Sequence, residues 1–305
     1  MWQVDNQKYN KLSWICESEG TVKDTLLNKM GMSVRLMVSL KSGDGIRKNN
    51  KKASVKEIVK KGDLIEACFP EEKNDYMPQK IDLTIHYEDD DLLVVEKPYD
   101  MVVHPTKTHY NDTMLNGILY YFKENNIHSK VRFVNRLDRY TSGVLLVAKN
   151  KFAHSFMSKN NGLWEMDKEY IAVVQGQMSG EGTIKGKIAL AEDGIKREVR
   201  SDGQEAITHY RVIASSEKAS LLSIQLETGR THQIRVHMSH LGHPLLGDEL
   251  YGGDTSAIAR QALHATRLGF FSPRKEKKQE IKIMLPDDIR ELIDRLFGLS
   301  FDKID

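Results

Sequence analysis

Beyond residue 80, apolar residues gather in short runs of strand length, and few stretches show the 3.6-residue period of an amphipathic helix. Pro273–Lys278 separates two strand-like pieces and is predicted to be an exposed hairpin loop. The spacing of the runs is too irregular, and helices between them are too sparse, for a doubly wound α/β fold. We therefore predict an α+β domain over residues 81–300, built around a large mixed or antiparallel sheet. The strand candidates are Leu92–Val95, Val144–Ala148, Tyr170–Val174, Thr183–Leu190, Thr208–Ala214, Leu221–Leu226 and Glu280–Leu285.

The first eighty residues have a different pattern, typical of a small separate unit. Thr21 precedes a helical stretch, and Ser33 can cap a second helix. A turn followed by a strand is predicted over Val59–Phe69, and the polar residues 70–79 are predicted to form a linker. These elements predict a small α/β module over residues 1–75.

Positive charge is concentrated in this module, although the net charge of the whole chain is only +2. Between Arg35 and Lys61 the chain carries nine basic residues against two acidic ones, Asp44 and Glu57. Such a segment suits a polyanionic partner such as RNA. A lysine-rich solvated surface would give the same pattern, so charge alone leaves both interpretations open.

Composition excludes several classes of protein. Apolar residues make up 40% of the chain and charged residues 29%, which is enough for a packed core. No run approaches the roughly 18 apolar residues of a membrane span, and Met1–Asp5 lacks the start of a secretory signal. Cys16 and Cys68 are too few for a disulfide framework or a four-thiolate zinc site, and are expected to be free thiols. We expect a cytoplasmic protein with no membrane segment.

Two loop segments are rich in polar residues that a core does not need. In the first, residues 134–143, Asp138 stands between Arg136 and Arg139, directly ahead of a predicted buried strand. An isolated loop aspartate usually accepts hydrogen bonds from local backbone amides. In the second, residues 227–244, Thr231 is predicted to cap a short helix, which puts Arg230 on a tight turn at the helix start. The apolar stripe of that helix would be Ile234, Met238 and Leu241.

Four histidines in the second segment raise the possibility of a zinc site, and with Asp248 they define a metal-dependent hydrolase as an alternative. Their spacings of five, three and three residues do not match a helical zinc signature, and no thiolate or carboxylate lies among them. Capping, packing and phosphate contacts are the preferred interpretation, with no metal bound. The histidines are His232, His237, His240 and His243.

Both segments belong to a series of motifs that resembles the RluA-type RNA pseudouridine synthases. Asn135–Gly143 is similar to that family's His-Arg-Leu-Asp-x-x-Thr-Ser-Gly signature, and five further motifs follow its order over residues 81–290. The chain departs from the family at Asn135, Asp100 and Glu96, where His, Gly and Asn are usual. Residues 1–80 resemble a diverged ribosomal-protein-type RNA-binding module. The further motifs are Glu96–Pro105, Lys168–Tyr170, Thr228–Arg235, His243–Gly252 and Leu263–Ala265.

The resemblance implies an isomerase that converts uridine to pseudouridine in structured RNA, with large-subunit ribosomal RNA favoured over transfer RNA. The C1′–N1 bond breaks, the uracil turns and C5 bonds to C1′, so no cofactor is required. It implies that Asp138 is the catalytic carboxylate, held by an ion pair with Arg230. It also implies that Tyr170 is a catalytic residue that receives the base and whose phenol could take the C5 proton. Whether Asp138 attacks C1′ or accepts the C2′ proton stays open.

The resemblance also implies residues that contact RNA. Arg136 is expected to enter the space that the flipped uridine leaves, with Arg139, Thr141 and His264 as further substrate contacts. The module is expected to bind RNA. No obligate protein partner is inferred for the protein, and a monomer is the default expectation because the sequence does not indicate an oligomeric state. A catalytically dead RNA-binding protein is the non-enzyme alternative, disfavoured because the aspartate, tyrosine and arginine are present. The expected RNA contacts of the module are Arg35, Arg47, Lys48, Lys51 and Lys52.

Overall fold

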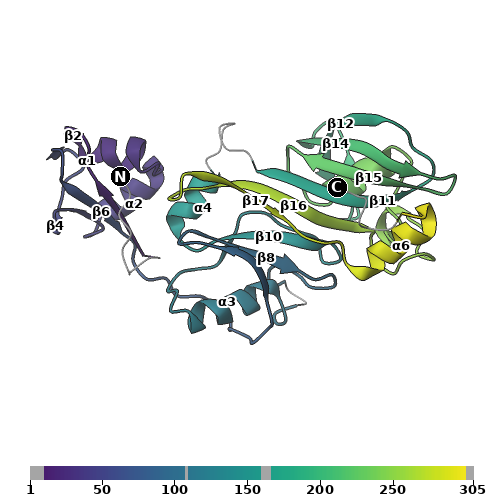
Figure 1. Cartoon of the computed structure of the whole chain (residues 1–305), viewed down its shortest axis with the longest axis horizontal. Helices are drawn as coiled ribbons and strands as arrows, with labels where there is room; N and C mark the ends of the chain where they lie inside the picture. The colour runs from purple at the N-terminus through teal and green to yellow at the C-terminus, as the bar shows by residue number, and fades with distance from the viewer. Residues whose placement is uncertain (1–9, 107–108, 159–165, 300–305) are drawn as a thin grey trace.

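The computed structural model describes residues 10–106, 109–158 and 166–299, which form a small N-terminal part and a much larger sheet domain (Figure 1). The small part lies at one end of the molecule, and the large sheet extends from it towards α6 (Asp287–Phe297) at the other end (Figure 1). In the described part of the chain, no helix is long and apolar enough to cross a membrane.

The N-terminal part combines two short helices with a four-stranded sheet in the order β1-β6-β3-β4. The predicted helices are confirmed, because Thr21 and Ser33 each accept a hydrogen bond from the first turn of their helix. The strand β1 has no counterpart among the predicted elements. The elements are β1 (Lys11–Ile15), β2 (Gly20–Thr21), α1 (Val22–Asp24) with a π-helical turn (Thr25–Lys29), α2 (Val34–Lys41), β3 (Ile46–Lys48), β4 (Lys51–Lys52), β5 (Ile58–Val59) and β6 (Leu64–Cys68).

The larger part is the α+β domain that the sequence predicts, built on an 11-stranded sheet. Its main path has the order β13-β12-β14-β15-β11-β16-β10-β8-β7, with β17 beside β16 and β9 beside β10. The strands are β7 (Thr84–Glu88), β8 (Leu92–Lys97), β9 (Arg132–Phe133), β10 (Ser142–Ala148), β11 (Asp167–Gln175), β12 (Glu181–Leu190), β13 (Arg197–Val199), β14 (Gln204–Ser215), β15 (Ala219–Leu226), β16 (Leu263–Ser272) and β17 (Lys277–Lys282). The other helices are α3 (Met114–Glu124), α4 (Lys151–Ser158), α5 (Gln233–His240) and a 3₁₀ turn (Glu249–Tyr251).

One strand pair in this sheet is parallel, and it fixes the loop that carries Asp138. The strands β10 and β16 run parallel, pairing Ser142 with His264 and Gly143 with Ala265. Gly143 has a φ of +127°, and a Cβ atom there would lie 2.4 Å from the carbonyl oxygen of Ala265. Only glycine lets the two strands approach this closely, so the small residues after Asp138 set where β10 begins.

Two local predictions in this domain are wrong. The last strand lies at Lys277–Lys282 rather than Glu280–Leu285, although the predicted hairpin loop before it is confirmed. Thr231 is not the cap of the short helix, because α5 begins at Gln233 and the N-cap position falls on His232, with a left-handed φ of 57°. The side-chain oxygen of Gln233 accepts hydrogen bonds from the Arg230 amide and the Thr228 hydroxyl, and so ties the preceding turn to the first residue of the helix.

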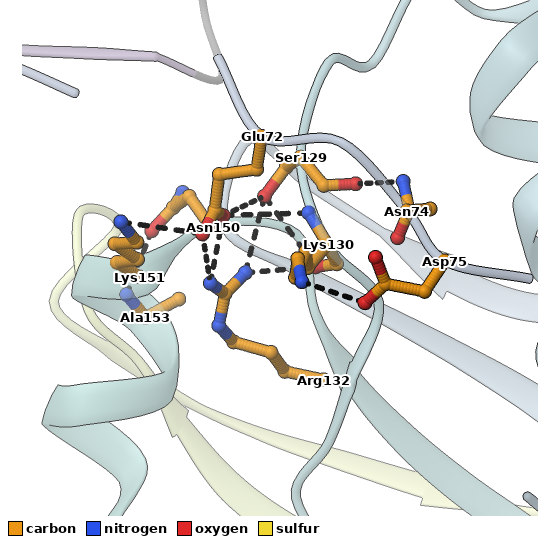
Figure 2. Close-up of polar contacts among 9 residues, drawn as sticks. All are labelled: Glu72, Asn74, Asp75, Ser129, Lys130, Arg132, Asn150, Lys151 and Ala153. Carbon is orange, nitrogen blue, oxygen red and sulfur yellow. Dashed lines mark hydrogen bonds and ion pairs between the residues drawn. The ribbon is translucent and has the colours of Figure 1, made fainter. Parts of the chain in front are cut away.

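The segment predicted as a linker packs against the sheet domain through Glu72 (Figure 2). Nη2 of Arg132 donates to both carboxylate oxygens of Glu72 at 2.7 Å, and Nζ of Lys151 lies 3.2 Å from the same carboxylate. The Glu72 and Arg132 side chains are only 12% and 15% exposed. Nearby, Nδ2 of Asn74 donates to the Ser129 carbonyl at 3.1 Å. The segment is therefore an anchored strap rather than a free linker.

The module itself also contacts the sheet domain, through α4. Phe152 is 1% exposed and belongs to the hydrophobic core of the module, with Phe156 packed beside it. The Ser155 hydroxyl donates to the hydroxyl of Ser33, the N-cap of α2, at 2.7 Å. Because a shared apolar core and the strap both join the two parts, the module has a defined position relative to the sheet.

Candidate active site

A cavity of about 570 Å³ opens where the loop before β10, the strand β11, the turn at residues 229–231 and the helix α5 meet. It brings together residues that are far apart in the sequence and were predicted to act together. Its lining includes Asp138, Tyr170, Lys168, Arg136, Arg230 and Arg235. A second cavity of about 860 Å³ shares Asp138 and Arg136, so a substrate can reach the carboxylate from two sides.

Asp138 is bound by an arginine as predicted, but that arginine is Arg235 and not Arg230. Nη1 of Arg235 donates to Oδ2 of Asp138 at 3.1 Å, and the Asp138 side chain is 27% exposed. The rest of the Arg235 guanidinium binds Asp248, with Nε–Oδ2 2.7 Å and Nη2–Oδ1 2.8 Å. Arg235 and Asp248 are 8% and 1% exposed, so the cation is rigidly placed beneath Asp138.

The prediction that Arg230 forms this ion pair is therefore wrong in this structure. Arg230 is exposed, and its Nε donates to the Glu205 carbonyl at 3.0 Å. The left-handed residue His232 turns the chain before α5 begins, and α5 then directs Arg235 inward. Arg230 still lines the cavity, where its charge faces an incoming substrate.

His232 and Tyr251 form a bonded pair beside the carboxylate. The Tyr251 hydroxyl lies 2.9 Å from Nδ1 of His232, and Nε2 of His232 lies 3.9 Å from Oδ2 of Asp138. The Arg235 guanidinium stacks over the Tyr251 ring at 4.9 Å. Burial lowers the pKa of His232, against the attraction of Asp138, so the imidazole is neutral near pH 7.

Tyr170 lines the cavity from the strand β11, as predicted, and is 6% exposed. Burial raises the pKa of its phenol well above the ordinary value, and the negative charge of Asp138 raises it further. The phenol is therefore protonated across the neutral range. This leaves Tyr170 as an apolar and hydrogen-bonding surface rather than a ready proton acceptor.

The other predicted substrate residues divide into cavity-lining and supporting groups. Arg136 is exposed and lines both cavities. Arg139 lines the second cavity, and its Nε donates to Asp100 at 2.7 Å. Thr141 is 2% exposed, and its amide donates to the Asp138 carbonyl, which closes the turn that presents the carboxylate.

His264 lies outside the cavity, contrary to its predicted contact with substrate. It is 0% exposed, and its Nδ1 lies 2.8 Å from the hydroxyl of Ser142. Burial lowers the pKa of His264 to about 3, so the ring is neutral. Its place on β16, opposite Ser142 on the parallel strand β10, makes it a support for the loop that carries Asp138 rather than a substrate contact.

Asn135, which stands where the family usually has histidine, fastens the loop that carries Asp138 to β10. Its Oδ1 accepts from the Leu146 amide at 2.7 Å, and its Nδ2 donates to the Val144 carbonyl at 3.1 Å. With these two hydrogen bonds, the Asn135 side chain pairs with β10 as the backbone of a neighbouring strand would. The departure from the family motif thus has a clear structural role.

Lys97 is a supporting residue whose role the sequence did not indicate, although it lies within the motif Glu96–Pro105. It is 0% exposed, and its Nζ donates to three carbonyls, those of Pro98, Met101 and Arg139, at 2.7–2.8 Å. Burial lowers its pKa to about 7. Because Arg139 directly follows Asp138, the Lys97 ammonium ties β8 to the loop that carries Asp138.

Replacing Lys97 tests that support. Lys97→Met leaves three part-buried carbonyls without their donor, and a group orphaned away from water costs on the order of 1–3 kcal/mol. We expect the free energy of unfolding to fall by about 2–5 kcal/mol, measured by urea denaturation. The matched control is the exposed Lys277, where Lys277→Met should change stability by less than about 0.5 kcal/mol. A free energy of unfolding of Lys97→Met equal to that of the wild type would contradict the stabilising role of Lys97.

The four clustered histidines do not converge on a common point. His237 bonds the Thr208 hydroxyl at 2.9 Å, and His243 bonds the Gln175 carbonyl at 2.8 Å. His232 faces Tyr251, while His240 is exposed at the end of α5. Across residues 10–106, 109–158 and 166–299, no group of three or more metal-binding side chains is placed to hold an ion.

The basic residues expected to bind RNA lie on one helix and one hairpin of the module. Arg35 is on α2, and the other four are on the β3–β4 hairpin. Arg47 pairs with Asp44 at 2.7 Å, and Nζ of Lys48 lies 3.3 Å from Asp63. Arg35, Lys51 and Lys52 are exposed, and they are the better candidates for contacts with RNA.

Residues 91–240 match the sequence profile of the RNA pseudouridylate synthase family. An uncharacterized RNA pseudouridine synthase of Bacillus subtilis (strain 168), YjbO, is 42% identical over 281 residues, covering 90% of this chain and 98% of the relative. Ribosomal large subunit pseudouridine synthase D of Yersinia pestis is 40% identical over 260 residues, covering 79% of each.

The fold agrees with these similarities. The structure of human RNA Pseudouridylate Synthase Domain Containing 1 superposes with a TM-score of 0.55 at 27% identity, covering 73% of this chain and 92% of the human one. On this sequence and structural evidence, the chain belongs to the RluA-type RNA pseudouridine synthases, isomerases that convert uridine to pseudouridine in RNA.

Proposed function

We propose that Asp138 is the catalytic carboxylate of this synthase and acts on a uridine that has left the RNA stack. The observation that carries the proposal is the geometry of Asp138, which is partly exposed to the cavity yet held by the buried Arg235–Asp248 pair. Cleavage of a glycosidic bond needs a carboxylate next to the anomeric carbon. The hydrogen bond from Arg235 fixes the orientation of that carboxylate at the cavity.

The reaction needs little beyond this carboxylate and a closed pocket. The C1′–N1 bond breaks, the uracil turns, C5 bonds to C1′, and the proton on C5 is replaced by the new bond while N1 gains one. Asp138 either bonds to C1′ or accepts the C2′ proton. Both routes place it on the sugar and not on the base.

Extruding a stacked base costs a few kcal/mol, which protein contacts must offset. Arg136 is exposed and lies where the two cavities meet, so we assign it to the space that the uridine vacates. We assign Tyr170 to contact with the flipped uracil, because bases gain about 1–3 kcal/mol from aromatic surfaces. Thr141 lines the first cavity and Arg139 lines the second.

Large-subunit ribosomal RNA is the substrate class that we propose. Relatives 40% identical to this chain carry the name ribosomal large subunit pseudouridine synthase D. The basic module fits a large folded RNA, where a second contact away from the target site adds affinity. We further propose that the protein works in the cytoplasm as a monomer.

Mapping pseudouridines in total RNA from cells with and without the gene tests this assignment. We expect one or a few large-subunit ribosomal positions to be uridine only in the deletion strain. The purified protein should restore them in excess chelator, because the proposed chemistry uses only protein groups. Loss of a transfer RNA position instead would overturn the substrate, and activity restored only by zinc would favour the metal-dependent alternative.

The module can be tested in the intact chain. Deleting it would also expose Phe152, which belongs to its core, so removing charge is the cleaner change. Replacing Arg35, Lys51 and Lys52 with Gln should raise KM and leave the single-turnover rate at saturating RNA unchanged. Three lost phosphate contacts should flatten the plot of log affinity against log salt by about 2 for single-stranded RNA.

The matched control removes the same charge from other exposed positions, with Lys80, Lys123 and Lys218 replaced by Gln. A phosphate-binding role of the module predicts a much smaller change for this control. Equal effects of the two triple variants would reduce the basic segment to a solvated surface. A fall in kcat without a change in salt dependence would instead point to a role in folding.

A further inference from the structure

A third hollow, of about 470 Å³, adjoins the active-site cavity on the side of the β12–β13 hairpin. It shares Arg136, Gly229, Arg230 and Thr231 with that cavity, so the two are continuous along one wall. The opposite wall is formed by Arg197 and Arg200 at β13, residues to which neither the motifs nor the proposed chemistry assign a role.

Positive charge dominates this hollow. Arginine side chains line it from three separate segments of the chain, while Asp202 is the one carboxylate among its described lining residues. Asp202 binds Arg200, with Nε–Oδ1 2.6 Å and Nη2–Oδ2 3.1 Å. The charges of Arg136, Arg197 and Arg230 therefore face the space without an acidic partner among the residues that line it.

Arg197 is the least satisfied of these arginines. Its Nε is buried and has no hydrogen-bond partner among the described residues. Its backbone is nevertheless fixed, because Arg197 pairs with Leu190 across the hairpin and its amide donates to the Tyr251 hydroxyl at 2.9 Å. Buried N–H groups are nearly always paired in native proteins. Because Arg197 is fixed, has a donor without a partner in the described part of the chain and lines the hollow, its guanidinium is a candidate to bind an acceptor that enters this space.

Arg197 also lies close to the chemistry. Its positive charge is one of the influences that lower the pKa of His232, after burial and the neighbouring Arg235. The same Tyr251 hydroxyl that accepts from the Arg197 amide contacts His232, which faces Asp138. Between the two hollows stands Gly229, where an added Cβ would meet nothing closer than Nζ of Lys168 at 4.0 Å. The space next to the Gly229 Cα is therefore open in both hollows.

We propose that Arg197, with Arg136 and Arg230, binds a backbone phosphodiester of the RNA next to the uridine that enters the active site. The inference rests on the proposed function only in that an RNA strand delivers this uridine to the cavity. A guanidinium group matches the geometry of a phosphate and can bind two of its oxygens. Such a contact carries no sequence information and fixes the register of the strand. Arg197 is thus a positioning residue for the substrate.

Binding of fluorescein-labelled dodecauridylate tests the site without turnover. In an Asp138→Asn background, Arg197→Gln should weaken binding about tenfold and reduce the slope of log affinity against log salt by about 0.7. Arg197→Lys, which keeps the charge, should restore most of the slope. The matched control is the exposed Arg211 on β14, outside the three cavities, and Arg211→Gln should leave the slope within error of the parent. Equal slopes for the parent and Arg197→Gln would overturn the proposal.

Replacing single phosphates of the RNA with neutral linkages identifies the phosphate that Arg197 contacts. In an RNA carrying a mapped target uridine, one methylphosphonate at a flanking linkage should raise KM of the wild-type enzyme about tenfold. The same linkage should have little further effect on Arg197→Gln, because the contact is already lost. Additive effects at every flanking linkage would overturn the assignment.

The two proposals fail in distinguishable ways. If wild-type protein forms no pseudouridine in any RNA, the proposed function fails, while the dodecauridylate slopes still decide the phosphate site. If wild-type protein is active and Arg197→Gln retains both KM and slope, only the phosphate site fails. If the thermal midpoint of Arg197→Gln is far below that of Arg211→Gln, Arg197→Lys is compared with the wild type instead. A lysine keeps the charge but lacks the planar guanidinium that binds two phosphate oxygens, so KM should still rise.

Discussion

Asp138→Asn should abolish pseudouridine formation while leaving RNA binding close to that of the wild type. The amide has nearly the shape of the carboxylate but is neutral, so it neither bonds to C1′ nor accepts the C2′ proton. Removing a group that acts directly on the reacting atoms typically lowers turnover by about 10⁴-fold or more. The measurement is single-turnover conversion of a mapped uridine, with dodecauridylate binding recorded in parallel.

The environment of Asp138 allows its role in turnover to be tested without a large loss of stability. The carboxylate is 27% exposed, so removing its charge should not leave a deeply buried partner without compensation. Arg235 keeps both of its hydrogen bonds to Asp248. We therefore expect the unfolding midpoint of Asp138→Asn to stay close to the wild type. Conversion well above a no-enzyme control by a clean preparation would remove Asp138 from the catalytic role.

Features encoded in a few neighbouring residues were predictable from the sequence. The caps Thr21 and Ser33, the strand-length apolar runs and the hairpin loop after Ser272 all depend on local patterns, and the structure contains them. The grouping of Asp138 and Tyr170 in one cavity followed from the motifs, because residues that the family places together are placed together here.

Features that depend on distant packing were not predictable. Arg230 and Arg235 belong to one motif, and the left-handed turn at His232 decides which of them reaches Asp138. Burial of His264 follows from the parallel pairing of β10 with β16, which no local pattern encodes. The contact of Glu72 with Arg132 joins residues 60 positions apart, so a polar run with the composition of a linker is in fact anchored.

Arg235→Gln should damage both stability and turnover, and a second substitution separates the two effects. Asp248 is 1% exposed and loses its charged partner in this variant. Breaking a buried ion pair from one side costs about 3–5 kcal/mol. Asp138 loses its cation as well, and a hydrogen bond to a charged group contributes about 1.5–3 kcal/mol. At about 1.4 kcal/mol per factor of ten, turnover should fall about 10- to 100-fold.

Arg274→Gln is the matched control for the loss of stability. Arg274 binds the buried Asp91 through Nε and Nη2 at 2.9 and 2.8 Å, and this pair lies outside the three cavities. The control should lose a comparable free energy of unfolding and keep its turnover at temperatures well below its midpoint. A parallel loss of turnover would show that instability alone lowers activity.

The double variant Arg235→Gln/Asp248→Asn removes both charges of the buried pair. Because no uncompensated carboxylate then remains beside position 235, part of the lost free energy of unfolding should return. Turnover should stay low, since Asp138 still lacks the cation that holds it. Urea denaturation and single-turnover conversion of the same preparations measure the two quantities. Recovery of turnover together with stability would mean that Arg235 supports the fold and that Asp138 works without a fixed partner.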